Sequence, residues 1–307
     1  MEKIKLRNKR ADKIVKNILL VTAVLSAVFI VIIIGIVAIR GLRPFFLSYD
    51  GATVNFFKFI TGTKYYAPEY RIGYIIVNTI YVVLLAILLS APISVLTALF
   101  VAKMAPKFLS NFLTTTIEVL ASIPSIIFGM FGKGYVVILV RNFADKFGIV
   151  TAGGQSTIAT VIVLAMMIMP TITMLSITAI KSVPEDMEHG SLALGASSTQ
   201  TMFSISLNAA KPGIFAGIIL GVGRALGEAT AVTMVAGGRG SGPTFGLFGT
   251  TRTLTSTILT GINEATLGSL EYDIRFSIGL VLIVVILVVN LILNGVKKRL
   301  GKYYEKS

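Results

Sequence analysis

Of the 307 residues, 54% are hydrophobic and 14% are charged, and the mean hydropathy is +0.85. Soluble domains carry about 25% charged residues, so this composition excludes an ordinary soluble protein. The net charge of +14 does not indicate nucleic acid, because the basic residues lie between apolar runs, where they orient a membrane protein. The absence of cysteine excludes disulfides, thiolate metal sites and cysteine nucleophiles.

Six apolar segments reach the length of about 20 residues that a helix needs to cross a bilayer. They are residues 17–39, 75–101, 110–131, 157–180, 212–236 and 274–293. We therefore predict an all-α polytopic membrane protein, with basic termini at 1–16 and 297–307. The first segment is too long for a cleavable signal and lacks a small-x-small site, so we interpret it as a retained span.

The distribution of positive charge predicts that both termini are cytoplasmic. The termini and the loops at 102–109 and 181–211 hold 16 Lys and Arg, whereas the much longer loops at 40–74, 132–156 and 237–275 hold 11. Basic residues concentrated in short segments beside the spans mark the cytoplasmic side.

Two outer loops contain recognisable features. The loop at 40–74 holds ten aromatic residues, which form either an interfacial belt or a docking surface for an external partner. In the loop at 237–273, Leu254, Ile258 and Ile262 recur at helical spacing and predict a short helix on the outer surface.

Three prolines interrupt the apolar segments, and one apolar run is too short to cross. Pro92, Pro124 and Pro170 lie in the second, third and fourth spans, where each removes a backbone donor and should bend its helix. The run 134–140 is expected to lie at the interface or to re-enter.

The polar stretch 182–198 separates two apolar spans and predicts a short helix. Ser182 and Glu185 have the spacing of a capping box, and Gly195 is expected to end the helix in a left-handed conformation. Val183, Met187 and Leu194 form an apolar stripe, and Ser197 or Ser198 caps a second helix. Such an element fits a groove on a partner, or else it folds against its own bundle.

The fifth span carries both close-packing glycines and charges. Gly213, Gly217 and Gly221 recur every four residues and allow another helix to approach. Arg224 and Glu228 follow, near mid-span, where an ionised residue costs roughly 2.5 to 3.5 kcal/mol. Either they neutralise each other along one helix turn, with Glu118 as a further partner, or Arg224 lines a path for an oxyanion and Glu228 holds it.

The loop EHGSLALGASSTQTMFSISLNAAKPG resembles the cytoplasmic loop of ABC importer permeases. Glu188, Gly195, Leu207 and Pro212 match the pattern of that family, whereas His189, Gly190 and Asn208 depart from it. The resemblance implies coupling helices, within the loop 182–211, that sit in a cleft of an ATPase subunit. It assigns ATPase coupling to four residues of this chain: Glu185, Glu188, Leu192 and Gly195.

Three further stretches narrow the resemblance. GRALGEATAVTMVAGG, TRTLTSTI and IEVLASIPSIIFGMFG are similar to the phosphate-specific ABC importer permeases, and more to the C-type than to the A-type subunit. This implies a type I importer transmembrane domain at 75–296, a second permease, a cytoplasmic ATPase dimer and an extracytoplasmic phosphate-binding protein, in the cell membrane of a prokaryote. It places Arg224 and Glu228, with Glu118 added from the charge argument above, along the substrate path.

No catalytic, cofactor-binding or metal-ligating residue is predicted. The nearest approach to a P-loop, GGRGSGPT at 237–244, has Pro243 where the lysine belongs, so ATP and Mg²⁺ are expected on the partner ATPase. His189 is expected to be a solvated loop residue. Three alternatives remain: a permease for another oxyanion, an ion-coupled carrier or channel, and a membrane scaffold.

Overall fold

The computed structural model describes the backbone of residues 2–49, 53–262 and 264–304, and the side chains of residues 11–49, 53–262 and 264–298. Six helical stretches within these ranges are long and apolar enough to cross a bilayer, which confirms the predicted all-α, six-span architecture. These stretches are Ala11–Phe46, Gly73–Met104, Ser125–Lys146, Thr157–Lys181, Ser198–Gly227 and Leu270–Lys298.

The elements fall into long helices, shorter helices, π-helical segments and one hairpin. The long helices are α1 (Glu2–Phe46), α3 (Gly73–Leu99), α7 (Thr157–Lys181), α10 (Leu207–Gly227) and α13 (Leu270–Tyr304). The shorter helices are α2 (Phe56–Thr61), α4 (Lys107–Ser122), α5 (Ser125–Phe131), α6 (Val137–Lys146), α8 (Glu185–Ala193), α9 (Ser198–Thr201), α11 (Thr230–Val235) and α12 (Leu254–Leu259). The π-helical segments are η1 (Phe100–Met104) after α3, η2 (Gly132–Val136) between α5 and α6, and η3 (Met202–Ser206) between α9 and α10. Strands β1 (Tyr65–Tyr66) and β2 (Glu69–Tyr70) form an antiparallel hairpin.

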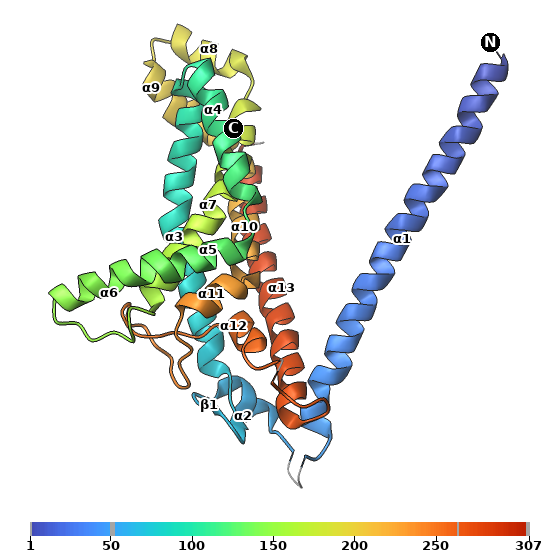
Figure 1. The fold of residues 1–307 in the computed structure, drawn as a ribbon. Helices are drawn as coiled ribbons and strands as arrows, with labels where there is room; N and C mark the ends of the chain where they lie inside the picture. Colours follow the sequence, from blue (N-terminus) through green and yellow to red (C-terminus); the bar gives the residue numbers. More distant parts are fainter. Residues whose placement is uncertain (1, 50–52, 263, 305–307) are drawn as a thin grey trace.

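Helix α7 lies at the centre of the bundle and packs against α3, α4 and α10 (Figure 1). Helix α10 approaches it closely at its glycines. A Cβ atom placed on Gly213 would lie 2.5 Å from the Cβ of Ala179, and one on Gly221 would lie 2.9 Å from Ile172. The predicted glycine surface is therefore confirmed as the contact with α7.

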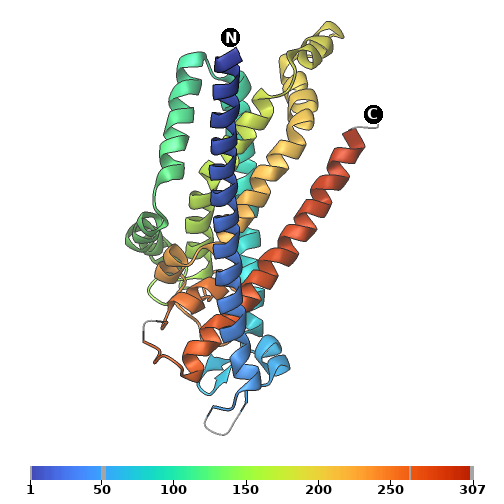
Figure 2. The same cartoon turned by 90° about the vertical axis from the view of Figure 1, so that its right-hand side faces the viewer.

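The molecule has two distinct ends (Figures 1 and 2). Helices α8 and α9 lie at the same end as the start of α1 and the end of α13. We call this end, with residues 100–109 and 182–206, the loop end. The opposite end holds the hairpin, α2, α12 and the residues around them, namely 45–49, 53–74, 236–262 and 264–275, and we call it the hairpin end.

The predicted third span at 110–131 is not one rod. Helix α4 ends at Ser122, and α5 begins at Ser125 with Pro124 as its N-cap residue, because proline lacks the N–H group that a continuous helix needs. From there α5, η2 and α6 run across the direction of the long helices and include the apolar run 134–140 (Figures 1 and 2). Pro92 and Pro170, by contrast, lie inside α3 and α7 as predicted.

Aromatic residues of the 40–74 loop build a local core at the hairpin end. Phe59, Tyr65 and Tyr74 are buried together with Leu254 and Ile274. The predicted short helix in the 237–273 loop exists as α12, but its position on the outer surface is wrong, because Leu254 is fully buried and its amide donates to the Thr79 hydroxyl at 3.0 Å. The belt and docking alternatives therefore concern only exposed aromatics such as Phe57.

Candidate functional site

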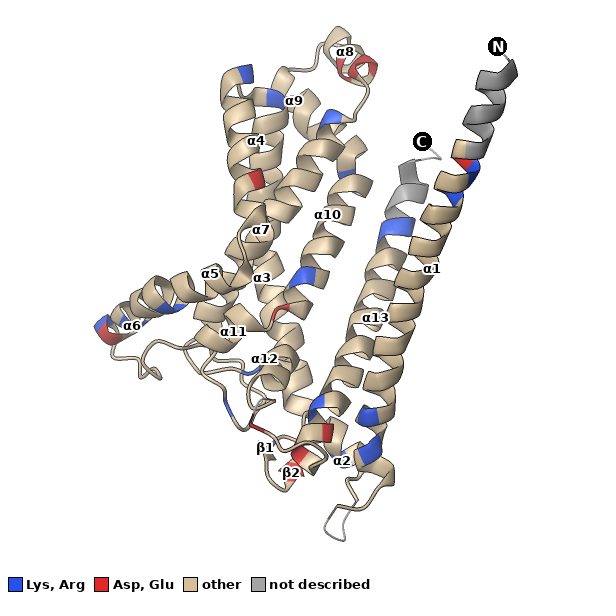
Figure 3. Cartoon of the chain, turned by 45° about the vertical axis from the view of Figure 1, so that its right-hand side comes forward, with Lys and Arg blue, Asp and Glu red and all other residues tan. Residues whose placement is uncertain are grey.

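Charged residues gather toward the two ends of the bundle, and few lie along the helices between them (Figure 3). Two parts of the molecule are candidate sites, one at an end of the bundle and one among the few charged residues between the ends. One is the α8–α9 element at the loop end, and the other is the charged segment where α10 ends.

The α8–α9 element projects apolar side chains from a polar scaffold. None of the residues of α8 is buried, and Leu192 is 42% exposed and Leu194 91% exposed. Gly195 has φ +88°, which confirms the left-handed residue predicted to end this helix. Ser197 and Gln200 form the capping box of α9, which confirms the second predicted cap.

The predicted capping box at Ser182 is wrong. Ser182 still has helical backbone angles as the last residue of the α7 turn, and its hydroxyl donates to the Thr178 carbonyl at 2.7 Å. Helix α8 begins after Pro184 without a side-chain cap. Val183 is only 6% exposed and belongs to the bundle core, so the predicted apolar stripe loses its first member.

Glu188 differs from its acidic neighbours on α8 because its side chain faces the bundle. Its Oε1 atom lies 2.5 Å from the Lys103 ammonium, which comes from η1, and accepts a hydrogen bond of 2.8 Å from the Ser206 hydroxyl, which comes from η3. Burial alone would raise the pKa of this carboxyl, but the hydrogen bonds and charge of its partners outweigh burial and lower it. Glu185, by contrast, is exposed.

Lys103 was missed by the sequence reasoning. It counted only as one basic residue of the loop 102–109, because a contact across 85 residues of chain leaves no spacing signal. The sequence offered one indication, namely Glu188 at a position that matches the family pattern, and this does not identify its partner.

The predicted pairing of Arg224 with Glu228 along one helix turn is not present. Helix α10 ends at Gly227, and Glu228 has extended backbone angles, so the two residues do not share a helical turn. Among the ion pairs of the described residues, none joins Arg224 to an acidic side chain. Instead, the Arg224 Nη1 atom donates to the Thr171 hydroxyl of α7 at 2.9 Å, and the side chain remains partly exposed.

Glu228 stabilises the interruption between helices α10 and α11. Its carboxylate accepts the Ala231 amide at 2.9 Å at the start of α11, where a negative charge is favourable. Its carbonyl accepts the Thr255 hydroxyl of α12 at 2.7 Å, and the residue is only 9% exposed. The geometry therefore shows Glu228 organising the backbone beside Arg224.

Glu118 lies on an exposed face of α4. No hydrogen bond or ion pair between its side chain and Arg224 occurs among the described residues. The structure therefore does not bring Glu118 together with the charged segment at the end of α10.

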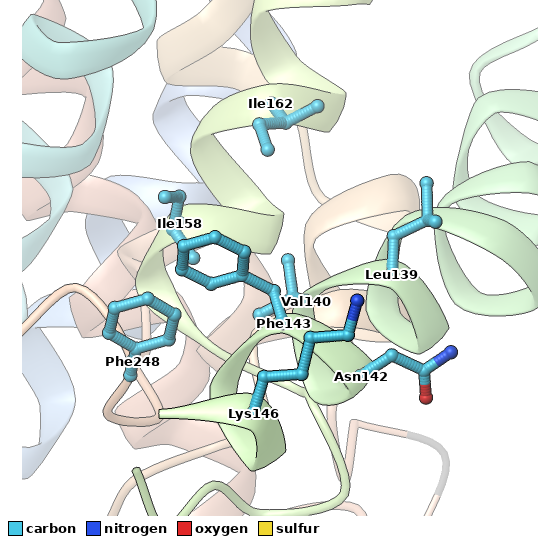
Figure 4. A pocket seen from close by; sticks show the side chains of 8 residues that line it. All are labelled: Leu139, Val140, Asn142, Phe143, Lys146, Ile158, Ile162 and Phe248. Carbon is cyan, nitrogen blue, oxygen red and sulfur yellow. The ribbon is translucent and has the colours of Figure 1, made fainter. Parts of the chain in front are cut away.

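A pocket of about 580 Å³ lies between α6, the start of α7 and Phe248 (Figure 4). Its lining is apolar apart from Asn142 and Lys146, as the labelled side chains show. An oxyanion needs several converging donors, so this pocket does not have the chemistry of an oxyanion site.

The fold is similar to that of a chain in a crystal structure of a bacterial alginate ABC transporter bound to its alginate-loaded periplasmic protein. The TM-score is 0.64, and the match covers 96% of this chain and 98% of that one at 17% sequence identity. At this identity the likeness shows the fold alone, which is that of an ABC importer transmembrane subunit.

The family follows from the sequence comparisons. Residues 94–305 match the family described as binding-protein-dependent transport system inner membrane component, and the chain belongs to this family. It is 32% identical over 302 residues to the probable ABC transporter permease protein YqgH of Bacillus subtilis, covering 95% of this chain and 93% of that protein. It is 31% identical to the phosphate transport system permease protein PstC of Pasteurella multocida, covering 84% of this chain and 86% of that protein.

Proposed function

We propose that the chain is a permease subunit of an ATP-driven importer that moves inorganic phosphate into the cytoplasm. The observation that carries this proposal is the similarity, over most of both chains, to a permease named for phosphate transport. Alternating access of the bundle, with the ATPase favouring one of its states, supplies the mechanism.

Arg224 is the residue proposed to meet the substrate. Its guanidinium presents planar N–H donors that match phosphate oxygens, and Thr171 orients it while leaving it partly exposed. Glu228 is proposed to keep the chain open beside it, because the cap at Ala231 and the bond from Thr255 hold the break in α10.

A different partner is proposed for each end of the molecule. The loop end faces the cytoplasm in this proposal, so that both termini are cytoplasmic and α8 and α9 meet an ATPase dimer through the exposed Leu192 and Leu194. A phosphate-binding protein docks at the hairpin end. The spanning part of α1, whose most apolar window is wholly unburied, packs against lipid or the second permease in the cell membrane of a prokaryote.

The alternative functions make different predictions for the loop end. An ion-coupled carrier or channel, or a membrane scaffold, does not require an exposed, capped helix pair there. A permease for sulfate or another oxyanion, or the A-type phosphate permease, fits the same donors and is separated by substrate and partner tests.

The test is reconstitution of the chain in liposomes with the second permease, the ATPase and the binding protein. We expect ATP-dependent uptake of radiolabelled phosphate that excess sulfate does not suppress. Arg224→Ala is expected to abolish uptake while the complex remains assembled by size-exclusion chromatography, because the donors are lost and the glycine contact between α10 and α7 is left in place. Uptake without ATP would support the carrier, suppression by sulfate would support another anion, and full uptake by Arg224→Ala would make the arginine structural.

A further inference from the structure

A single carboxylate connects α8 to two different spanning stretches. The Oε1 atom of Glu188 receives Lys103 from the end of the α3 stretch and Ser206 from the start of the α10 stretch. Lys103 precedes α8 in the sequence, and Ser206 follows it. A displacement of α8 therefore acts on both stretches through the same atom.

The burial of the three groups distinguishes this contact from an ordinary surface ion pair. The Lys103 and Glu188 side chains are 16% and 20% exposed, and Ser206 is fully buried. Exposed pairs contribute little to stability, whereas removing one partner of a shielded pair leaves the other charge without compensation. Glu188 is thus the acidic residue of α8 whose position depends on the bundle.

Both partners of Glu188 lie in π-helical segments. Lys103 lies within η1, and Ser206 is the last residue of η3. A π-helical turn holds an additional residue, and each residue turns the side-chain direction by about 100° in an α-helix. The two wide turns therefore set where Lys103 and Ser206 point, and single π turns of this kind are frequent at functional sites.

Among the described residues, α8 makes one further side-chain hydrogen bond to the rest of the chain. None of its residues is buried, and the Ser191 hydroxyl shares a hydrogen bond of 2.9 Å with Thr201 of α9. The α10 stretch continues from Ser206 to Arg224 and ends at the break held by Glu228. Movement transmitted at Ser206 therefore reaches the charged segment along one helical stretch.

We infer that Lys103, Glu188 and Ser206 form a latch that transmits the motion of α8 to α3 and α10 together, with Lys103 as a positioning residue for the coupling of ATP hydrolysis to transport. This inference rests on the proposed function. It assigns Glu188 an inward, mechanical role, whereas the exposed Leu192 and Leu194 are left to contact the ATPase.

The experiment measures phosphate taken up per ATP hydrolysed in the complete reconstituted complex. Lys103→Met keeps the length of the stem and removes the charge, Lys103→Arg keeps the ion pair, and Lys107→Met is the matched control because Lys107 is exposed on the neighbouring α4. We expect Lys103→Met to lower the ratio at least about fivefold, the lower end of typical coupling between two sites. Lys103→Arg and Lys107→Met should retain the wild-type ratio.

A double-mutant cycle tests whether the lysine acts through Glu188. Lys103→Met combined with Glu188→Gln should be no worse than either single change, because both remove the same contact. Additive losses, or a wild-type ratio in Lys103→Met, would overturn the latch. Wild-type complex that hydrolyses ATP but does not import phosphate would instead count against the proposed function.

A second measurement needs no ATPase and applies even where a variant assembles poorly. Hydrogen exchange of the α8 amides in the purified full chain should accelerate in Lys103→Met, whereas exchange in α12 should not change. Equal exchange of α8 in Lys103→Met and Lys107→Met would also overturn the inference.

Discussion

The two ends of the molecule are held together by different kinds of interaction. At the hairpin end, buried side chains such as Phe59, Leu254 and Ile274 form a core, and loop amides bond to distant carbonyls, as Tyr65 does to Gly240 at 2.8 Å. At the loop end, α8 has no buried residue and is attached mainly through side chains.

This difference indicates which end is held less firmly. Buried apolar area and backbone hydrogen bonds cannot be given up one at a time, whereas a side-chain latch can open without exposing a core. Burial of the Tyr65 side chain in this core also raises its pKa from 10.0 to about 12. We therefore regard α8, at the loop end, as more easily displaced than the packed core of the hairpin end.

The largest contrast between the ends is expected from the same substitution made at each. Leu254→Ala removes a fully buried side chain and should lower the free energy of unfolding by about 2–5 kcal/mol. Leu192→Ala, at a side chain that is 42% exposed, should change it by less than about 0.5 kcal/mol. Thermal unfolding in detergent measures both, and equal losses would remove the distinction between the ends.

A smaller effect is expected at the end of α8. Gly195 has φ +88° and open space around its Cβ position, so Gly195→Val introduces backbone strain of about 1–2 kcal/mol without a clash. The strain should misplace α8 and uncouple ATP hydrolysis from uptake while membrane insertion persists. Gly190→Ala is the matched control, because Gly190 lies within α8, also has open space and should slightly favour the helix. Normal coupling in Gly195→Val would argue against the docking role of this segment.

The smallest effect is the pH dependence of the latch. Because the folded pKa of Glu188 is lowered from its ordinary value of 4.5, the stabilisation is present above that value and is lost as the pH falls through the lowered pKa. We expect α8 to loosen below pH 4.5, by about 1 kcal/mol or less. Since the chain has no cysteine, a spin label at Gly190→Cys reports this mobility. The same label combined with Glu188→Gln should show no such step, and a step in both would assign the change to another group.

Much of the fold could be predicted from local sequence patterns. The number of long apolar helices, the left-handed Gly195 and the Ser197 cap depend on segment length or on a few neighbouring residues, and the structure confirms them. The third candidate span lies at Ser125–Lys146, however, and not at the predicted 110–131. The glycines of α10 were recognised because small residues at intervals of four have one main use in a membrane helix.

The errors arose where a residue had two local options. Ser182 can cap the next helix or bond back into the preceding one, and the structure uses the second. Pro124 can bend a continuous helix or separate two helices, and here it separates α4 from α5 as the N-cap residue of α5. The i,i+4 spacing of Arg224 and Glu228 predicted a pair only on the assumption that α10 continues, and it ends between them.

The sequence alone determined that this chain spans the membrane six times and carries a capped polar element between two spans, because hydrophobic length and capping chemistry act over a few residues. Only the tertiary structure decided that Glu188 meets Lys103 and Ser206, that Arg224 bonds to Thr171, and that α12 is buried. These contacts join residues far apart in the chain. Their partners are brought together by the packing of whole helices against one another, which no local pattern encodes.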